Sequence, residues 1–101
     1  MSKVSIVATI TAKDGRGDDI VAAFEGARGA IEAEPGTLIY TLHRNAADPN
    51  VFYVTEVYED QAALDAHMTG PGMAALAGIA DAVAENGVSL QFAAPVVQLA
   101  G

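Results

Sequence analysis

Residues 34–73 read EPGTLIYTLHRNAADPNVFYVTEVYEDQAALDAHMTGPGM, and they predict two strands joined by a loop and followed by an interrupted helix. Apolar and polar side chains alternate over residues 38–43 and again over 51–58, which is the period of a β-strand. Asp60 is placed to cap a helix, and the Gly-Pro-Gly sequence at 70–72 interrupts that helix. Both histidines and all three tyrosines of the chain lie in this stretch, so we expect it to supply any reactive site.

The residues before this stretch predict one strand and one helix. Residues 4–10 alternate with the period of a strand, and residues 13–17 contain turn formers. From Asp18 onward, apolar residues recur at steps of three and four, which is the period of an α-helix; they are Ile20, Phe24, Ala27 and Ile31. We expect this helix to end at residues 34–36, because Pro35 disfavours helical geometry in the residue before it.

The residues after this stretch predict a second helical piece, a fourth strand and an apolar tail. The helical piece has an apolar stripe formed by Met73, Leu76, Ala80 and Val83. We expect Asn86 and Gly87 to stop it, because both residue types tolerate the left-handed backbone geometry. Residues 88–92 then predict a strand. Residues 96–99 predict an extended tail, which we expect to pair with a strand edge of a partner copy.

The resulting order, βαββαβ, predicts an α+β fold of the ferredoxin-like type, with a four-stranded antiparallel sheet and both helices on one face. The strands carry apolar residues on both faces: Leu38 and Leu42 point to one side, and Ile39 points to the other. Two helices can cover only one face of the sheet. Another copy of the chain is the simplest cover for the second face, so we expect a homodimer.

Composition limits the kind of protein. A chain of 101 residues predicts a single domain over 1–101. The net charge of −8 would repel nucleic acid and anionic lipid, so we expect neither nucleic acid nor a membrane as partner. No apolar run approaches the ~20 residues of a membrane helix and the start is no signal peptide, so we expect a soluble, cytoplasmic protein. Without cysteine, phosphate loop or metal-spaced cluster, the sequence predicts no metal site and no bound cofactor.

Three segments together carry a resemblance to a known family. They are Pro35-Gly36-Thr37-Leu38-x-Tyr40, then Asp48-Pro49 with Phe52, then Glu56-x-Tyr58-x-Asp60-x-x-Ala63-Leu64-x-x-His67. The chain thereby resembles the antibiotic biosynthesis monooxygenase (ABM) domain, whose members include quinol monooxygenases and form small dimers called dimeric α+β barrels. The resemblance implies oxidation of a phenol or quinol by molecular oxygen without a cofactor.

The chain departs from the family's pattern at two places. Tyr58 stands where many members have Trp, and residues 70–73 stand where many members have a second His or another polar residue. The haem-degrading branch of the superfamily resembles this chain in fold but uses a Trp. The absence of any Trp here counts against haem breakdown.

Two residues are candidates for acid–base catalysis. His67 shares a helix side with Ala63, Leu64 and Met68, so it can point into the space between helix and sheet and act as the base. The alternative is a partly buried His that bonds to backbone or to Glu56. Glu56 lies among apolar residues, where burial would raise its pKa and make it a base or a partner of His67. Its alternative role is structural.

Other residues of this stretch are candidates for substrate binding or for structure. Tyr40 and Tyr58 could orient a substrate oxygen, although strand tyrosines more often serve packing. The remaining residues that we expect to contact substrate are Phe52, Leu64, Met68 and Met73. By contrast, we expect His43 at the surface or an interface, and Asn45 and Asp60 as turn and cap residues.

The function that these residues favour is a cofactor-independent monooxygenase acting on a quinol, phenol or aromatic polyketide with O2. One alternative is a non-catalytic dimeric module that binds a small apolar ligand. Another is an isomerase or decarboxylase that uses the same pocket without oxygen. Oxygen uptake separates the first function from the other two.

Overall fold

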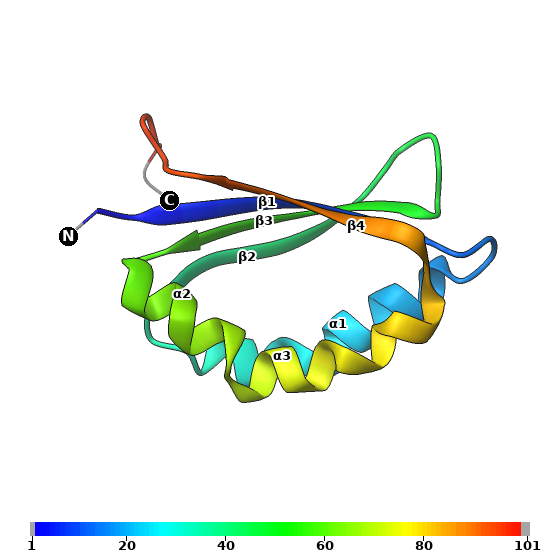
Figure 1. The fold of residues 1–101 in the computed structure, drawn as a ribbon, viewed down its shortest axis with the longest axis horizontal. Helices are drawn as coiled ribbons and strands as arrows, with labels where there is room; N and C mark the ends of the chain where they lie inside the picture. Colours follow the sequence, from blue (N-terminus) through cyan, green and yellow to red (C-terminus); the bar gives the residue numbers. More distant parts are fainter. Residues whose placement is uncertain (1, 100–101) are drawn as a thin grey trace.

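The helices of the chain lie on one face of a four-stranded antiparallel sheet (Figure 1). The computed structural model describes residues 2–99. Its elements are β1 (Val4–Ala12), α1 (Gly17–Glu32), β2 (Thr37–Arg44), β3 (Val51–Tyr58), α2 (Gln61–Met68), α3 (Pro71–Leu76), the 3₁₀ segment η1 (Ala77–Ala82) and β4 (Val83–Ala93). The strand order is β2-β3-β1-β4. The βαββαβ order and the ferredoxin-like arrangement predicted from the sequence are therefore confirmed.

The alternation of the two central strands produces the core. Ile6, Ala8 and Ile10 of β1 and Phe52 and Val54 of β3 are all buried on the face that the helices cover. Burial of one large apolar side chain stabilises the folded state by about 1.5–3 kcal/mol. The opposite side chains of the same strands point away from the helices, because successive residues of a strand alternate between faces.

Local signals set the helix boundaries near the predicted places. Helix α1 carries Asp18 and Asp19 in its first turn, next to the positive end of its dipole, and it ends at Glu32, before Pro35. The side chain of Asp60 accepts a hydrogen bond of 2.9 Å from the backbone N–H of Ala63 and so caps α2, as predicted.

The boundary between the last helical piece and β4 differs from the prediction. Val83 does not continue the helix but begins β4, and Asn86 lies inside that strand rather than after a helix. Asn86 does adopt the left-handed geometry, with φ of 55°. It does so where the pairing of β1 with β4 shifts register between Ile10 and Ala12, which marks a bulge. A Cβ on Gly87 would lie 2.6 Å from the carbonyl oxygen of Thr11, so this bulge brings backbone against backbone.

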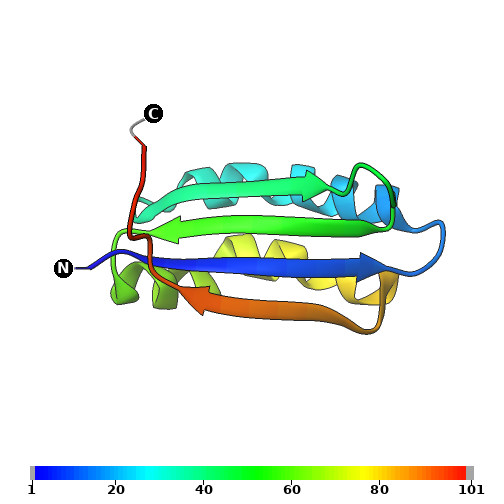
Figure 2. The same cartoon turned by 90° about the horizontal axis from the view of Figure 1, so that it is seen from above.

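The outer face of the sheet is left uncovered by the described part of the chain. In Figure 2 the four strands lie in front of the helices, and this face is turned to the viewer. Val7, Ile39, Tyr53 and Val57 are among the side chains on it, and the others are Thr, Ser, Gln, Ala, Val and His. None of the described strand residues that the pairing places on this face is Asp, Glu, Lys or Arg. Apolar residues are therefore present on both faces, as predicted, and on the outer face they are mixed with uncharged polar residues.

The tail after β4 turns to the same side of the sheet. Beyond Ala93 the chain rises away from the helices (Figure 1). It bends at Val96 and Val97, so it does not continue as the extended segment predicted from the sequence. Val96, Val97 and Leu99 are 93%, 87% and 88% exposed, so these side chains bury little surface against the rest of the described chain. As to membranes, no helix within residues 2–99 is long and apolar enough to cross one.

The junction between α3 and α1 gives a test of this packing. A Cβ on Gly72 would lie 2.6 Å from Cγ1 of Ile31, whereas a Cβ on Gly29 of α1 would meet no atom within 4 Å. We expect Gly72→Ala to lower the free energy of unfolding by about 1–3 kcal/mol, because it overpacks this junction. The control Gly29→Ala should raise it by about 0.5–1 kcal/mol. Urea denaturation measures both, and wild-type stability for Gly72→Ala would contradict the close approach of α3 to α1.

Candidate active site

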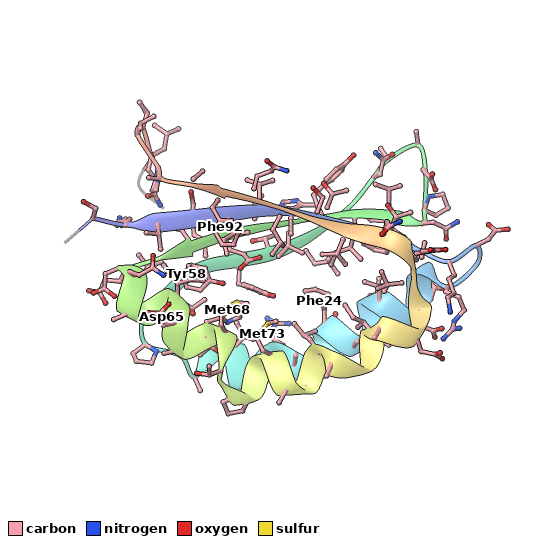
Figure 3. The ribbon with its side chains drawn as sticks, in the orientation of Figure 1. Phe24, Tyr58, Asp65, Met68, Met73 and Phe92 are labelled. Atoms are coloured by element: carbon pink, nitrogen blue, oxygen red, sulfur yellow. The ribbon has the colours of Figure 1, made fainter. Side chains whose placement is uncertain are left out.

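A cavity of about 780 Å³ lies between the sheet and the segment formed by α2, α3 and η1. Its walls are mostly apolar, and small residues of α3, η1 and β4 line one side: Ala74, Ala77, Ala80 and Ala84. Val88 and Leu90 of β4 line it as well and are 52% and 43% exposed, so the cavity opens toward this edge strand. Figure 3 shows Met68, Met73 and Phe24 reaching from the helices toward the sheet, and Phe92 pointing from β4 toward the same space.

Only three titratable side chains are among the residues that line this cavity: Tyr40, Glu56 and His67. They come from three elements, β2, β3 and α2. Pairing of β2 with β3 places Tyr40 directly opposite Glu56, so both side chains point to the helix side. The cavity therefore combines a polar cluster with an apolar surface, as small-molecule sites do.

His67 is held by a carboxylate that is distant in the sequence. The side chain is only 1% exposed, and its Nδ1 lies 2.8 Å from Oε1 of Glu34, in the turn between α1 and β2. Its ring centroid lies 5.1 Å from that of Tyr40 and 5.2 Å from that of Tyr58. Because Nδ1 is engaged by Glu34, Nε2 is the ring nitrogen left to interact with a molecule in the cavity.

Glu56 and Tyr58 form a second buried pair. They are two residues apart on β3, and the hydroxyl of Tyr58 donates a hydrogen bond to Oε1 of Glu56. Burial raises the pKa of Glu56, although the hydrogen bond from Tyr58 and the charge of His67 oppose this rise. Burial also raises the pKa of Tyr58, and the bond to Glu56 adds to the effect. Tyr58 therefore stays protonated at neutral pH.

Tyr40 is also kept neutral by its surroundings. Burial raises its pKa well above the ordinary value of 10.0, and the charges of Glu56 and Glu34 raise it further. A neutral phenol can donate its proton to an acceptor in the cavity. Its ring stacks on that of Phe24, with centroids 6.2 Å apart, which fixes its position against α1.

The structure brings together five of the eight predicted site residues on the cavity wall: Tyr40, Glu56, His67, Met68 and Met73. Tyr58 is fully buried and contacts the ring of His67 without lining the cavity. Two of the eight lie elsewhere in the core. Phe52 is fully buried, with the guanidinium of Arg44 5.0 Å above its ring, and Leu64 packs in the main core cluster.

The residues predicted to be structural have such contacts. The side chain of Asn45 accepts hydrogen bonds from the backbone N–H groups of Ala47 and Asp48, as a turn residue does. His43 is exposed, and its Nε2 lies 3.0 Å from the hydroxyl of Thr55. As for metals, no group of three or more His, Asp or Glu side chains within residues 2–99 is arranged to hold an ion.

Sequence reasoning missed Glu34. It assigned this residue only to the end of a helix, and it named Glu56 or backbone as the partner of His67. The sequence does contain a signal. Glu34 lies just after the C-terminus of α1, which is the negative end of the helix dipole, and the last turn of α1 has no basic residue. An acidic group there is unfavourable without a partner.

The antibiotic biosynthesis monooxygenase (ABM) family model matches residues 3–78. The chain belongs to this family. The matched part spans β1 to α3 and contains Glu34, Tyr40, Glu56 and His67. The resemblance seen in the sequence is thus confirmed over residues 3–78. No match to a curated protein is found.

Solved structures resemble this ABM protein over nearly its whole length. PA3566 from Pseudomonas aeruginosa is 24% identical, with 96% of this chain and 97% of that chain covered and a TM-score of 0.83. NE2512 from Nitrosomonas europaea, a protein of unknown function, is 22% identical, with 100% and 96% covered and a TM-score of 0.85. Rv0793 from Mycobacterium tuberculosis is 21% identical, with 98% and 100% covered and a TM-score of 0.85. At these identities the likeness shows the fold alone.

The raised pKa of Glu56 predicts a pH-dependent stability. Between the ordinary pKa and the raised one, the folded protein binds a proton that the unfolded chain has released, so wild-type stability falls as pH rises through this window. Glu56→Gln removes this dependence. The free energy of unfolding of the variant, relative to wild type, should therefore increase from pH 5 to pH 9 in urea denaturation.

The exposed neighbour Glu59 provides the control for this measurement. Glu59→Gln should shift the free energy of unfolding by a similar amount at every pH. A difference between Glu56→Gln and wild type that stays constant from pH 5 to pH 9 would show that burial does not govern the ionisation of Glu56.

Proposed function

We propose that this ABM protein is a cofactor-independent monooxygenase that oxidises a quinol, phenol or aromatic polyketide with O2, and that His67 is its base. The observation that carries the proposal is the position of His67. It lines an apolar cavity at 1% exposure, with Nδ1 held by Glu34 and Nε2 left for a substrate proton. A general base must lie within hydrogen-bond reach of the proton that it removes.

The chemistry explains why a base and an apolar cavity suffice. A neutral quinol reacts slowly with O2, because singlet substrate and triplet oxygen must pass through a one-electron step. The anion gives up an electron far more readily, but a phenol ionises in water only near pH 10. Conversion of a quinol and O2 into a hydroxyquinone and water takes all four electrons from the substrate. No external reductant is therefore required.

The lining of the cavity supports an aromatic substrate. Its volume of about 780 Å³ falls within the ~300–1,000 Å³ of typical ligand sites. Thioethers such as those of Met68 and Met73 make favourable contacts with aromatic rings. Tyr40 is neutral, so its hydroxyl can donate a hydrogen bond to a substrate oxygen.

The same proposal includes a homodimer built through the outer face of the sheet. None of the paired strand residues on that face carries a formal charge, although the chain as a whole has a net charge of −8. The segment after β4, whose residues Val96, Val97 and Leu99 are exposed, turns to the same side (Figure 1). An uncharged face that carries Val7, Ile39, Tyr53 and Val57 is suited to a symmetric contact with a second copy.

Oxygen uptake with a panel of quinols tests the proposed activity. We expect His67→Ala to reduce the rate of quinol oxidation by about 10²–10⁴, which is the usual contribution of a general base. His43→Ala is the matched control, because His43 lies on the outer face of the sheet, away from the cavity, and bonds only to Thr55 among the described side chains. It should keep the wild-type rate.

Three results would reject this assignment. If the His67→Ala variant oxidises quinol at the wild-type rate across pH 6–9, His67 is only a packing residue. Conversion of substrate without oxygen uptake would instead favour an isomerase or decarboxylase. Tight binding of an aromatic with no turnover would favour a non-catalytic binding module.

Light scattering tests the dimer. At micromolar concentration the wild type should have twice the chain mass of 10.3 kDa. Val7→Glu places a charge on the outer face and should give monomers, whereas Ala75→Glu, on the exposed side of α3, should leave the dimer intact. A monomeric wild type would exclude a dimer through this face.

A further inference from the structure

Glu34 makes contacts that a residue serving only to end a helix would not need. Its Oε1 accepts a hydrogen bond of 2.7 Å from the hydroxyl of Thr37 and lies 2.8 Å from Nδ1 of His67. Its Oε2 is the one buried side-chain polar atom within residues 2–99 that has no hydrogen-bond partner. The side chain is 14% exposed, so its negative charge acts on His67 with little screening by water.

The break between α2 and α3 lies beside this carboxylate. A Cβ on Gly72 would lie 2.6 Å from Cγ1 of Ile31 and 3.1 Å from Oε2 of Glu34, so the missing side chain leaves room for both residues. At Gly70 the atom that a Cβ would meet first is the carbonyl oxygen of Ala66, at 2.9 Å. The close approach of Glu34 and Ile31 therefore gives a structural reason for Gly72, which at the sequence level belongs only to a departure from the family's pattern.

The contact with Glu34 determines which ring nitrogen of His67 carries a proton. A carboxylate only accepts hydrogen bonds, so Nδ1 of His67 must be the protonated nitrogen. In a neutral ring, Nε2 then keeps its lone pair and can accept a proton. The other titratable groups facing the ring are Tyr40, Tyr58 and Glu56, and none of them bonds to Nδ1.

We propose that Glu34 is the positioning residue of the base: it holds His67 in the Nδ1–H form with Nε2 free, and it stabilises the imidazolium that forms when Nε2 takes the substrate proton. Glu34 does not line the cavity, so it acts through His67 and not on the substrate. The inference rests on the proposed function, in which His67 is the base. Thr37 supports it by fixing Oε1 from the other side.

Nitrogen NMR of the His67 ring tests the positioning without any turnover. In the wild type, ¹⁵N shifts should show a protonated Nδ1 and a bare Nε2. Glu34→Gln is nearly isosteric but uncharged, and its amide can present an N–H as well as an oxygen to Nδ1, so the Nδ1–H form should lose its preference and an Nε2–H population should appear in the spectrum. The matched control is Glu32→Gln, two residues earlier, because Glu32 is exposed and bonds to Arg28. It should leave the wild-type shifts unchanged.

Activity gives the second readout. A base held in the wrong tautomer loses a factor of up to ~10⁴ in turnover, so Glu34→Gln should lower kcat by about 10²–10⁴ with little change in KM. Glu32→Gln should retain the wild-type kcat. Far-UV circular dichroism and the remaining NMR spectrum of Glu34→Gln should match the wild type, which separates a tautomer change from unfolding.

The NMR measurement and the activity measurement test the role of Glu34 and the proposed function separately. A wild-type ring protonated on Nε2, or a tautomer that Glu34→Gln leaves unchanged, would overturn the role of Glu34 whatever the activity. A wild type that shows the Nδ1–H form but takes up no oxygen with any quinol would reject the proposed function and leave the structural assignment of Glu34 standing. Equal kcat for Glu34→Gln and wild type would overturn the role of Glu34 in the reaction.

Discussion

The hydrogen bond between His67 and Glu34 joins the last turn of α2 to the turn between α1 and β2, and the polar cluster is built around it. A buried polar group without a partner costs about 1–3 kcal/mol, so an imidazole at 1% exposure requires such a bond. The bond also leaves one ring nitrogen free. The same contact thus gives one buried ring nitrogen its partner and, under the proposed function, leaves the other for a substrate proton.

The cavity beside this bond exists because the helices cover their face of the sheet incompletely. Helix α2 ends at Met68, and the Gly-Pro-Gly sequence redirects the chain into α3 and η1, where Ala74, Ala77 and Ala80 are three of the six residues that line the cavity. These short side chains do not fill the space under β1 and β4. Val88, Leu90 and Phe92 therefore remain 52%, 43% and 69% exposed, although they are on the helix side of the sheet.

The parts of the fold that depend on local patterns could be predicted from the sequence, and those that depend on distant contacts could not. The alternation of apolar and polar residues predicts β1, β2 and β3, and the helical spacing of apolar residues predicts α1. The position of Asp60 predicts a helix cap. The start of β4 was missed, because Val83 fits a helical stripe and its strand geometry comes from pairing with Ala12. His67 was recognised as a candidate, but its partner lies 33 residues earlier.

If the cavity takes a proton from a phenol, as proposed, the absorbance of a bound nitrophenol measures this directly, because the nitrophenol anion absorbs visible light. The wild-type protein and the dye are mixed without oxygen, at a pH below the solution pKa of the dye. The anion band should appear and saturate as protein is added. A dye that binds and keeps its proton, or that does not bind at all, would show that the cavity does not take up a phenolic proton.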